Sequence, residues 1–150
     1  MEMANTKPSG APMLWNLTYA DPDRWKEVHA ISGQPLPWWK RTGSPRMRLL
    51  HGPDPLSSMI EETSDVKWAN LQRTQTGAIL YFRVRLELYG MPCARATTRW
   101  CFQQSAAGTE LHLHHEKGLV RLGLSSTPSR GLLALLEAAF GPENVSKVHV

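Results

Sequence analysis

Arginine and histidine side chains recur at alternate positions in the second half of the chain, where they could bind an anion. Arg83 and Arg85 lie in one alternating segment, Arg99 lies in the next, and His112 and His114 lie in a third. A period of two places such residues on one face of a β-strand. Because the planar guanidinium group pairs with phosphate through two hydrogen bonds, the pattern favours a phosphate-bearing partner.

Two turns decide which of these residues face one another. A turn at residues 90–92 would place Arg83 opposite Arg99, and Arg85 opposite Thr97. Both strands then keep their apolar residues on one face, as they must, because a slip of one residue would invert every side chain.

The next turn, at residues 105–108, sets the pairing on the face opposite the apolar residues, the outer face. It would pair Arg99 with His114 and Cys101 with His112 across two antiparallel strands. Arg121 joins this face unless a glycine bulge at Gly118 reverses the parity of the last strand.

The predicted sheet face is strongly cationic. It gathers six basic or titratable side chains, namely Arg83, Arg85, Arg95, Arg99, His112 and His114. Only Glu87 and Glu110 offset them. Like charges on opposite strands repel each other, and an anionic partner would relieve that repulsion. The alternative, a basic outer face that is simply solvated, stays open at this point.

Six tryptophans occur in the chain, and two of them are adjacent. Trp38 and Trp39 lie between a pair of prolines and the basic pair Lys40-Arg41. Neighbouring side chains point in different directions, so we expect at least one of the two indoles to be exposed. An exposed indole beside basic residues can stack on a nucleic-acid base. A tryptophan lid over the core is the alternative.

The histidines also raise the question of a metal or a catalytic site. His112 and His114 could share a metal on one strand face, but a third ligand is needed, and Glu116 lies too close in sequence to fit the cupin spacing. Cys101 opposite His112 could form a nucleophile and its base, yet no third, orienting group is evident. We therefore predict no catalytic residue, metal or cofactor, and expect a binding protein rather than an enzyme.

The elements that carry these residues indicate an α+β fold. Asp21-Pro22 is a typical helix start, and Gly33 can end that helix. A second helix follows Ser126-Thr127-Pro128. The alternating segments between the two helices are joined by short connections. They predict an antiparallel sheet of about four strands, with N-terminal helical segments and a C-terminal helix packed on one face. We expect a disordered arm over residues 1–12 and a single domain over 13–150, with an edge strand possible at 145–150.

Composition sets wider limits. The chain has 150 residues, a formal charge of +4 and 41% hydrophobic residues, enough for one core. No apolar run approaches the roughly 18–20 residues that a membrane helix needs. Cys93 and Cys101 do not make a secreted disulfide scaffold, and residues 1–12 lack the apolar stretch of a signal peptide, so we expect an intracellular protein. The apolar stripe of the last helix, centred on Leu132 to Phe140, is wider than one sheet face needs, and this predicts a homodimer.

The last third of the chain resembles the tombusvirus RNA-silencing suppressors and their aureusvirus relatives. The residues that carry the resemblance are Ala96-Thr97-Thr98-Arg99-Trp100, Gly108-Thr109, Gly118-Leu119, Ser125-Ser126, Ser129-Arg130, Leu132, Leu135, Glu137 and Ala139. The chain departs from that family in having adjacent tryptophans and a strand-like middle.

The resemblance implies a cytoplasmic homodimer, in a host cell if the protein is viral, that binds double-stranded RNA without reading its sequence and sequesters small duplexes. The residues it implies as contacts to phosphates and 2′-hydroxyls are Arg83, Arg85, Thr97, Arg99, His112, His114 and Arg121, with Ser125 and Ser126 near the strand end. Trp38 and Trp39 would stack on the duplex ends.

A second interpretation also fits the order of the elements. A curved antiparallel sheet with a leucine-rich final helix is similar to the Bet v 1/START-like helix-grip fold, whose members bind or cyclise an apolar small molecule. In that case the apolar face of the sheet lines a pocket, and the arginine face is only solvated.

Overall fold

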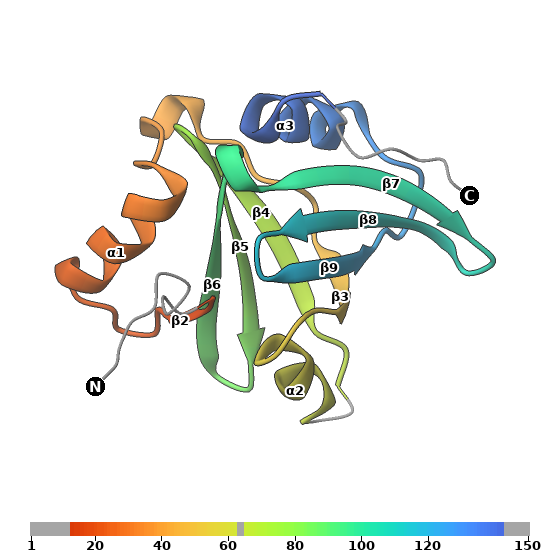
Figure 1. Ribbon diagram of the computed structural model, residues 1–150, viewed down its shortest axis with the longest axis horizontal. Helices are drawn as coiled ribbons and strands as arrows, with labels where there is room; N and C mark the ends of the chain where they lie inside the picture. The colour runs from red at the N-terminus through yellow and green to blue at the C-terminus, as the bar shows by residue number, and fades with distance from the viewer. Residues whose placement is uncertain (1–12, 63–64, 143–150) are drawn as a thin grey trace.

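A single antiparallel sheet of eight strands forms most of the molecule. The computed structural model describes residues 13–62 and 65–142, and it shows this sheet with three α-helices (Figure 1). The predicted sheet of about four strands is therefore wrong. The predicted arm at 1–12 and the possible strand at 145–150 lie outside the described residues.

The strand order across the sheet is β2-β6-β5-β4-β3-β9-β8-β7. The elements are β2 (Trp15–Asn16), α1 (Pro22–Ser32), η2 (Trp38–Lys40), β3 (Met47–His51), α2 (Leu56–Glu61), β4 (Trp68–Thr74), β5 (Gly77–Val84), β6 (Glu87–Ala94), η3 (Arg95–Thr97), β7 (Arg99–Ser105), β8 (Gly108–His115), β9 (Gly118–Gly123) and α3 (Arg130–Phe140).

Strand β3 joins two halves of the sheet that run in different directions in Figure 1. It pairs with β4 on one side and with β9 on the other, and its register to β9 shifts between Leu49 and His51. A shift of this kind bends a strand and increases its local twist. The apolar faces of both halves therefore meet in one core, and the opposite, outer face of the sheet turns toward solvent.

The turn between β5 and β6 was predicted at the wrong place. The chain reverses at Arg85 and Leu86, so that Val84 pairs with Glu87, and the predicted turn at residues 90–92 lies inside β6. Pro92 fits there because it lies beyond the short strand β2, where β6 is the edge of the sheet. A missing N–H at an edge removes no ladder hydrogen bond. Gly90 and Pro92 thus belong to a strand, and the prediction of a turn there is wrong.

Helix α1 covers the outer face of β5 and β6. Asp21 accepts a hydrogen bond from the Arg24 N–H, proline follows it in the first turn, and the helix ends at Gly33 with φ 92°. Val28 packs with Trp15, Leu17 and Ile79 in a second, smaller cluster. This end of the outer face is therefore closed, and only the part beyond α1 is available to a partner.

Helix α3 packs on the inner side, against β4, β5, β7 and η3. Ser129 caps it through the Leu132 N–H, one residue later than the predicted start, and it ends at Gly141. Its apolar stripe lies in the chain's own core, and of its leucines only Leu133 is exposed. The width of the stripe is thus used within one chain and no longer motivates a homodimer. No helix among the described residues is long and apolar enough to span a membrane.

Candidate nucleic-acid interface

The outer face carries two adjacent rows of polar and aromatic side chains across β3, β4 and β5. Arg48 pairs with Trp68, and the pairing of Ala69 with Phe82 brings Trp68 opposite Arg83. The second row contains Asn70 opposite Tyr81. Alternation along these strands sends Ala69 and Phe82 into the core and leaves the row residues outside.

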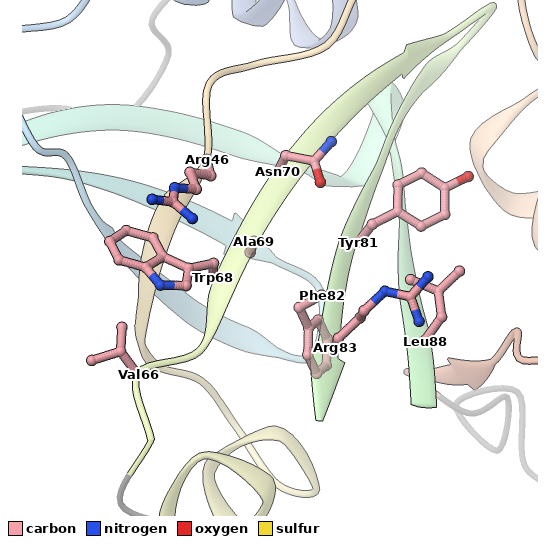
Figure 2. Close-up of a pocket in the computed structure, with 9 residues that line it drawn as sticks. All are labelled: Arg46, Val66, Trp68, Ala69, Asn70, Tyr81, Phe82, Arg83 and Leu88. Atoms are coloured by element: carbon pink, nitrogen blue, oxygen red, sulfur yellow. The ribbon is translucent and has the colours of Figure 1, made fainter. Parts of the chain in front are cut away.

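A shallow groove of about 460 Å³ lies on these rows (Figure 2). Its lining residues are Arg46, Val66, Trp68, Ala69, Asn70, Tyr81, Phe82, Arg83 and Leu88. None of them is acidic. The indole of Trp68 is 38% exposed, and the Arg46 guanidinium lies over it with Cζ 4.5 Å from the ring centroid. The groove therefore offers an aromatic face, positive charge and amide and phenol groups in one place.

The two groove arginines keep their charge available. Among residues 13–62 and 65–142, neither Arg46 nor Arg83 has a carboxylate within ion-pair distance. Arg85 differs, because it contacts Glu62 at 3.6 Å from the turn, where its φ is 57°. Burial raises the pKa of Tyr81, while the positive charge of Arg41 offsets part of that shift. The Tyr81 phenol is thus protonated at neutral pH and can donate a hydrogen bond.

The other half of the outer face has the predicted register. Arg99 pairs with His114, and Cys101 pairs with His112, which in turn pairs with Arg121. The first two pairings were predicted and are confirmed, and the pairing of His112 with Arg121 is added by the structure. The parity of β9 is not reversed, since the pairing continues without a shift from Gly118 onward.

Glu110 is the acidic residue within this half. Arg121 donates to both of its carboxylate oxygens, at 2.9 and 2.8 Å, and His112 Nε2 lies 3.0 Å from one of them. The hydrogen bonds from Arg121 hold the pKa of Glu110 at about 2, well below its ordinary value of 4.5. Arg121 is therefore already paired, while Arg99 has no carboxylate within ion-pair distance in the described part of the chain.

Cys101 and His112 do have an orienting carboxylate, Glu110, which the sequence did not reveal. A nucleophile also has to reach its substrate. Cys101 is fully buried under its neighbours, so its thiol offers no approach to a substrate carbonyl or phosphate. The arrangement of thiol, imidazole and carboxylate therefore does not form an open active site.

The remaining predicted contacts are spread over the molecule. Arg83 does not face Arg99, because β5 and β7 lie at separate places in the sheet. Thr97 is exposed in η3, and Ser125 and Ser126 are exposed after β9. These residues do not form the single row that the wrong turn at residues 90–92 had implied.

Trp38 and Trp39 are both exposed, at 77% and 66%, in the short helix η2. The two rings contact each other edge to face, with centroids 5.9 Å apart. The predicted exposure of at least one indole is confirmed, and neither ring is a lid over the core.

Five residues of the interface were missed, namely Arg46, Arg48, Trp68, Asn70 and Tyr81. Arg46 and Arg48 flank the buried Met47 with a period of two, so the sequence did contain a signal for an outward-facing arginine pair. Trp68 begins the alternating segment that continues through Ala69 and Leu71. What the sequence could not show is that β3 and β4 are neighbours, which brings these residues beside Arg83.

No family model, curated protein or solved structure matches the chain. The resemblance of its last third to the silencing suppressors therefore stays a prediction.

Proposed function

We propose that the protein binds RNA through the outer face of its sheet, with the Trp68 groove as the centre of the interface. The observation that carries the proposal is the groove itself, where an exposed indole lies between two arginines, Arg46 and Arg83, that have no acidic partner among the described residues. Nucleic-acid sites of this type combine backbone-neutralising cations with aromatic rings on which bases stack.

The chemistry of the lining residues assigns their roles. Arg46 and Arg83 pair with phosphate oxygens, and Arg48, one strand away from Trp68, extends the positive surface. Trp68 stacks on a base that is unpaired or lies at the end of a duplex. Asn70 and Tyr81 supply hydrogen bonds to a base edge or a 2′-hydroxyl. Phosphate and 2′-hydroxyl contacts carry no sequence information, so binding that relies on them is independent of sequence.

Double-stranded RNA fits this surface in its general features. A-form RNA presents phosphates and 2′-hydroxyls along a wide, shallow minor groove and is recognised by shape. Arg99 adds positive charge on the far half of the bent sheet, and the exposed Trp38 and Trp39 can cap a duplex end. Such binding would allow a homodimer to sequester small duplexes and so suppress RNA silencing. The support for this further role is the resemblance of the last third of the chain alone.

The helix-grip alternative lacks a comparable observation. It needs a pocket between the sheet and the last helix, yet that space holds a packed core. Leu71, Leu80 and Leu136 are fully buried there, together with Leu111 and Leu122. The apolar face of the sheet is thus filled by the chain's own side chains.

A gel-shift titration with a short RNA duplex tests the proposal. The double substitution Arg46→Ala with Arg83→Ala should weaken binding at least tenfold, because two charged phosphate contacts are lost. Arg130→Ala is the matched control, since this exposed arginine begins α3 outside the groove and should leave the affinity unchanged. Equal affinities of the double variant and the wild type would refute the proposed role of the groove.

A further inference from the structure

Three side chains with metal-ligating atoms meet on the outer face, away from the Trp68 groove. Cys101 on β7 pairs with His112 on β8, and His114 lies two residues further along the same strand face. One ligand atom from each of the three residues lies within 4.8 Å of the other two. The sequence had suggested a histidine pair without a third ligand, and the register of the hairpin supplies that ligand as Cys101.

We propose that Cys101, His112 and His114 form a binding site for a transition-metal ion, with Zn²⁺ as the expected occupant. Thiolate sulfur and imidazole nitrogen are both zinc ligands, and a site with three protein ligands leaves the fourth position to water. Ligand atoms around tetrahedral zinc lie about 3.3–3.8 Å apart at the usual bond lengths of roughly 2.0–2.3 Å. Side-chain rotations that close the cluster by about an ångström are therefore enough to form the site.

The surroundings of His112 support a ligand role. Its Nε2 is hydrogen-bonded to Glu110 at 3.0 Å, which leaves Nδ1 as the ring nitrogen for a metal. Arg121 holds the Glu110 carboxylate through two further hydrogen bonds. Histidines that bind metals commonly donate their second N–H to a carboxylate, which fixes the ring and strengthens the ligand. This second layer is already in place around His112.

Burial and charge are also compatible with a bound ion. Cys101 is fully buried, while the two histidines are partly exposed, so the ion would enter from the solvent side and reach the sulfur last. Arg99, opposite His114, disfavours a cation. The thiolate and the Glu110 carboxylate offset that charge. The inference does not depend on RNA binding, because the groove residues lie on other strands.

Titration of the reduced, metal-free protein with Co²⁺ tests the site directly. Cobalt bound to a thiolate gives a ligand-to-metal charge-transfer band in the near ultraviolet, which histidine ligation alone does not produce. We expect one Co²⁺ per chain with this band, and displacement of the cobalt by Zn²⁺. His112→Gln and His114→Gln should each weaken binding at least tenfold. Glu110→Gln should weaken it about 10–100-fold, as is usual for an outer-layer partner.

Matched variants separate this site from adventitious binding. Cys101→Ser should abolish the charge-transfer band, whereas Cys93→Ala should keep it, because Cys93 faces the core. His29→Gln is the control for the histidines, since His29 lies on α1, where its ring stacks on Trp25. Circular dichroism of each metal-free variant checks folding. If Cys101→Ser does not fold, the cobalt affinity of His114→Gln is the deciding measurement. A wild-type protein without the band, a band that survives in Cys101→Ser, or a cobalt affinity of His114→Gln equal to that of the wild type would overturn the proposal.

Discussion

The guanidinium group of Arg46 lies over the indole of Trp68, with Cζ 4.5 Å from the ring centroid. This cation–π contact joins a residue that precedes β3 to the first residue of β4 on the outer face of the sheet. Contacts of this type stabilise exposed pairs by about 0.5–1 kcal/mol, enough to orient the ring but too little to explain an exposed tryptophan by stability alone. We interpret the pair as part of a preorganised binding surface, in which the ring orientation is fixed in the unbound protein.

Replacement of Trp68 by alanine should weaken RNA binding without unfolding the protein. Stacking of one base on an aromatic ring contributes about 1–3 kcal/mol, so the affinity should fall roughly tenfold or more. Trp68 belongs to neither core cluster, and we expect the melting temperature to stay within a few degrees of the wild type. Fluorescence anisotropy with a labelled duplex gives the affinity. Trp68→Phe retains an aromatic face and should keep most of the affinity for RNA. An affinity of Trp68→Phe as low as that of Trp68→Ala would contradict the stacking role.

The double substitution Trp38→Ala with Trp39→Ala should discriminate between duplex lengths. Stacking on a base pair is possible only at a duplex end, whereas phosphate contacts occur along the whole length. Short duplexes, whose ends lie within one footprint, should therefore bind about tenfold more weakly, and long duplexes should bind as before. Both rings are exposed, so the fold should persist. A parallel titration of a short and a long duplex measures this, and an equal loss on both would exclude end stacking.

The hairpin of β7 and β8 could be predicted residue by residue, and the hairpin of β5 and β6 could not. Strict alternation and a polar turn fix the pairing of Arg99 with His114, because alternation excludes a slip of one residue, which would bury charge, and the turn sets the strand ends. In β6, Gly90 and Pro92 imitate a turn, and only the position of Pro92 at a sheet edge explains why they belong to a strand. Local composition cannot reveal such an edge.

The interface itself depends on pairings between distant segments. Arg46 and Trp68 are brought together by the pairing of β3 with β4, and α2 lies between those strands in the sequence. The metal-ligand cluster does not depend on pairing between distant segments, since both of its strands belong to one hairpin. The sequence indicated its three residues as two separate pairs, His112 with His114 and Cys101 with His112. Because both pairs contain His112, together they predict the cluster of three.

Trp100 connects β7 to the end of α3, and Trp100→Phe should destabilise the fold. Its Nε1 donates to the Gly141 carbonyl at 2.9 Å in a fully buried position. Loss of the donor leaves that buried carbonyl without this hydrogen bond, which costs about 1–3 kcal/mol. Urea denaturation should show a lower midpoint with an unchanged slope. A midpoint equal to that of the wild type would show that the hydrogen bond contributes nothing to stability.

The Glu110–Arg121 pair should make stability depend on pH in the acid range. The folded-state pKa of Glu110, about 2, lies below its ordinary value of 4.5. A lowered carboxyl pKa contributes stability that is present above pH 4.5 and is lost as the pH falls toward 2. Because Arg121 is partly exposed, we expect a contribution on the order of 1 kcal/mol.

Glu110→Gln tests this contribution in the presence of a chelator. The variant should be less stable than the wild type at pH 7, and the difference should shrink between pH 4.5 and pH 2. Thermal melts over that range measure the difference. A gap that stays constant with pH would show that the carboxylate charge is not its cause.

The salt dependence of RNA binding tests the central claim, that phosphates bind to the arginines of the outer face. Each neutralised phosphate adds roughly 0.9 to the slope of log affinity against log salt, by the estimate for duplex DNA. The measurement is the affinity of the wild type, of the variant with Arg46→Ala and Arg83→Ala, and of Arg130→Ala for one short duplex across a series of salt concentrations. We predict a steep slope for the wild type and for Arg130→Ala, and a slope lower by roughly 2 for the double variant. A wild type that does not bind the duplex, or a double variant with the wild-type slope, would contradict the account.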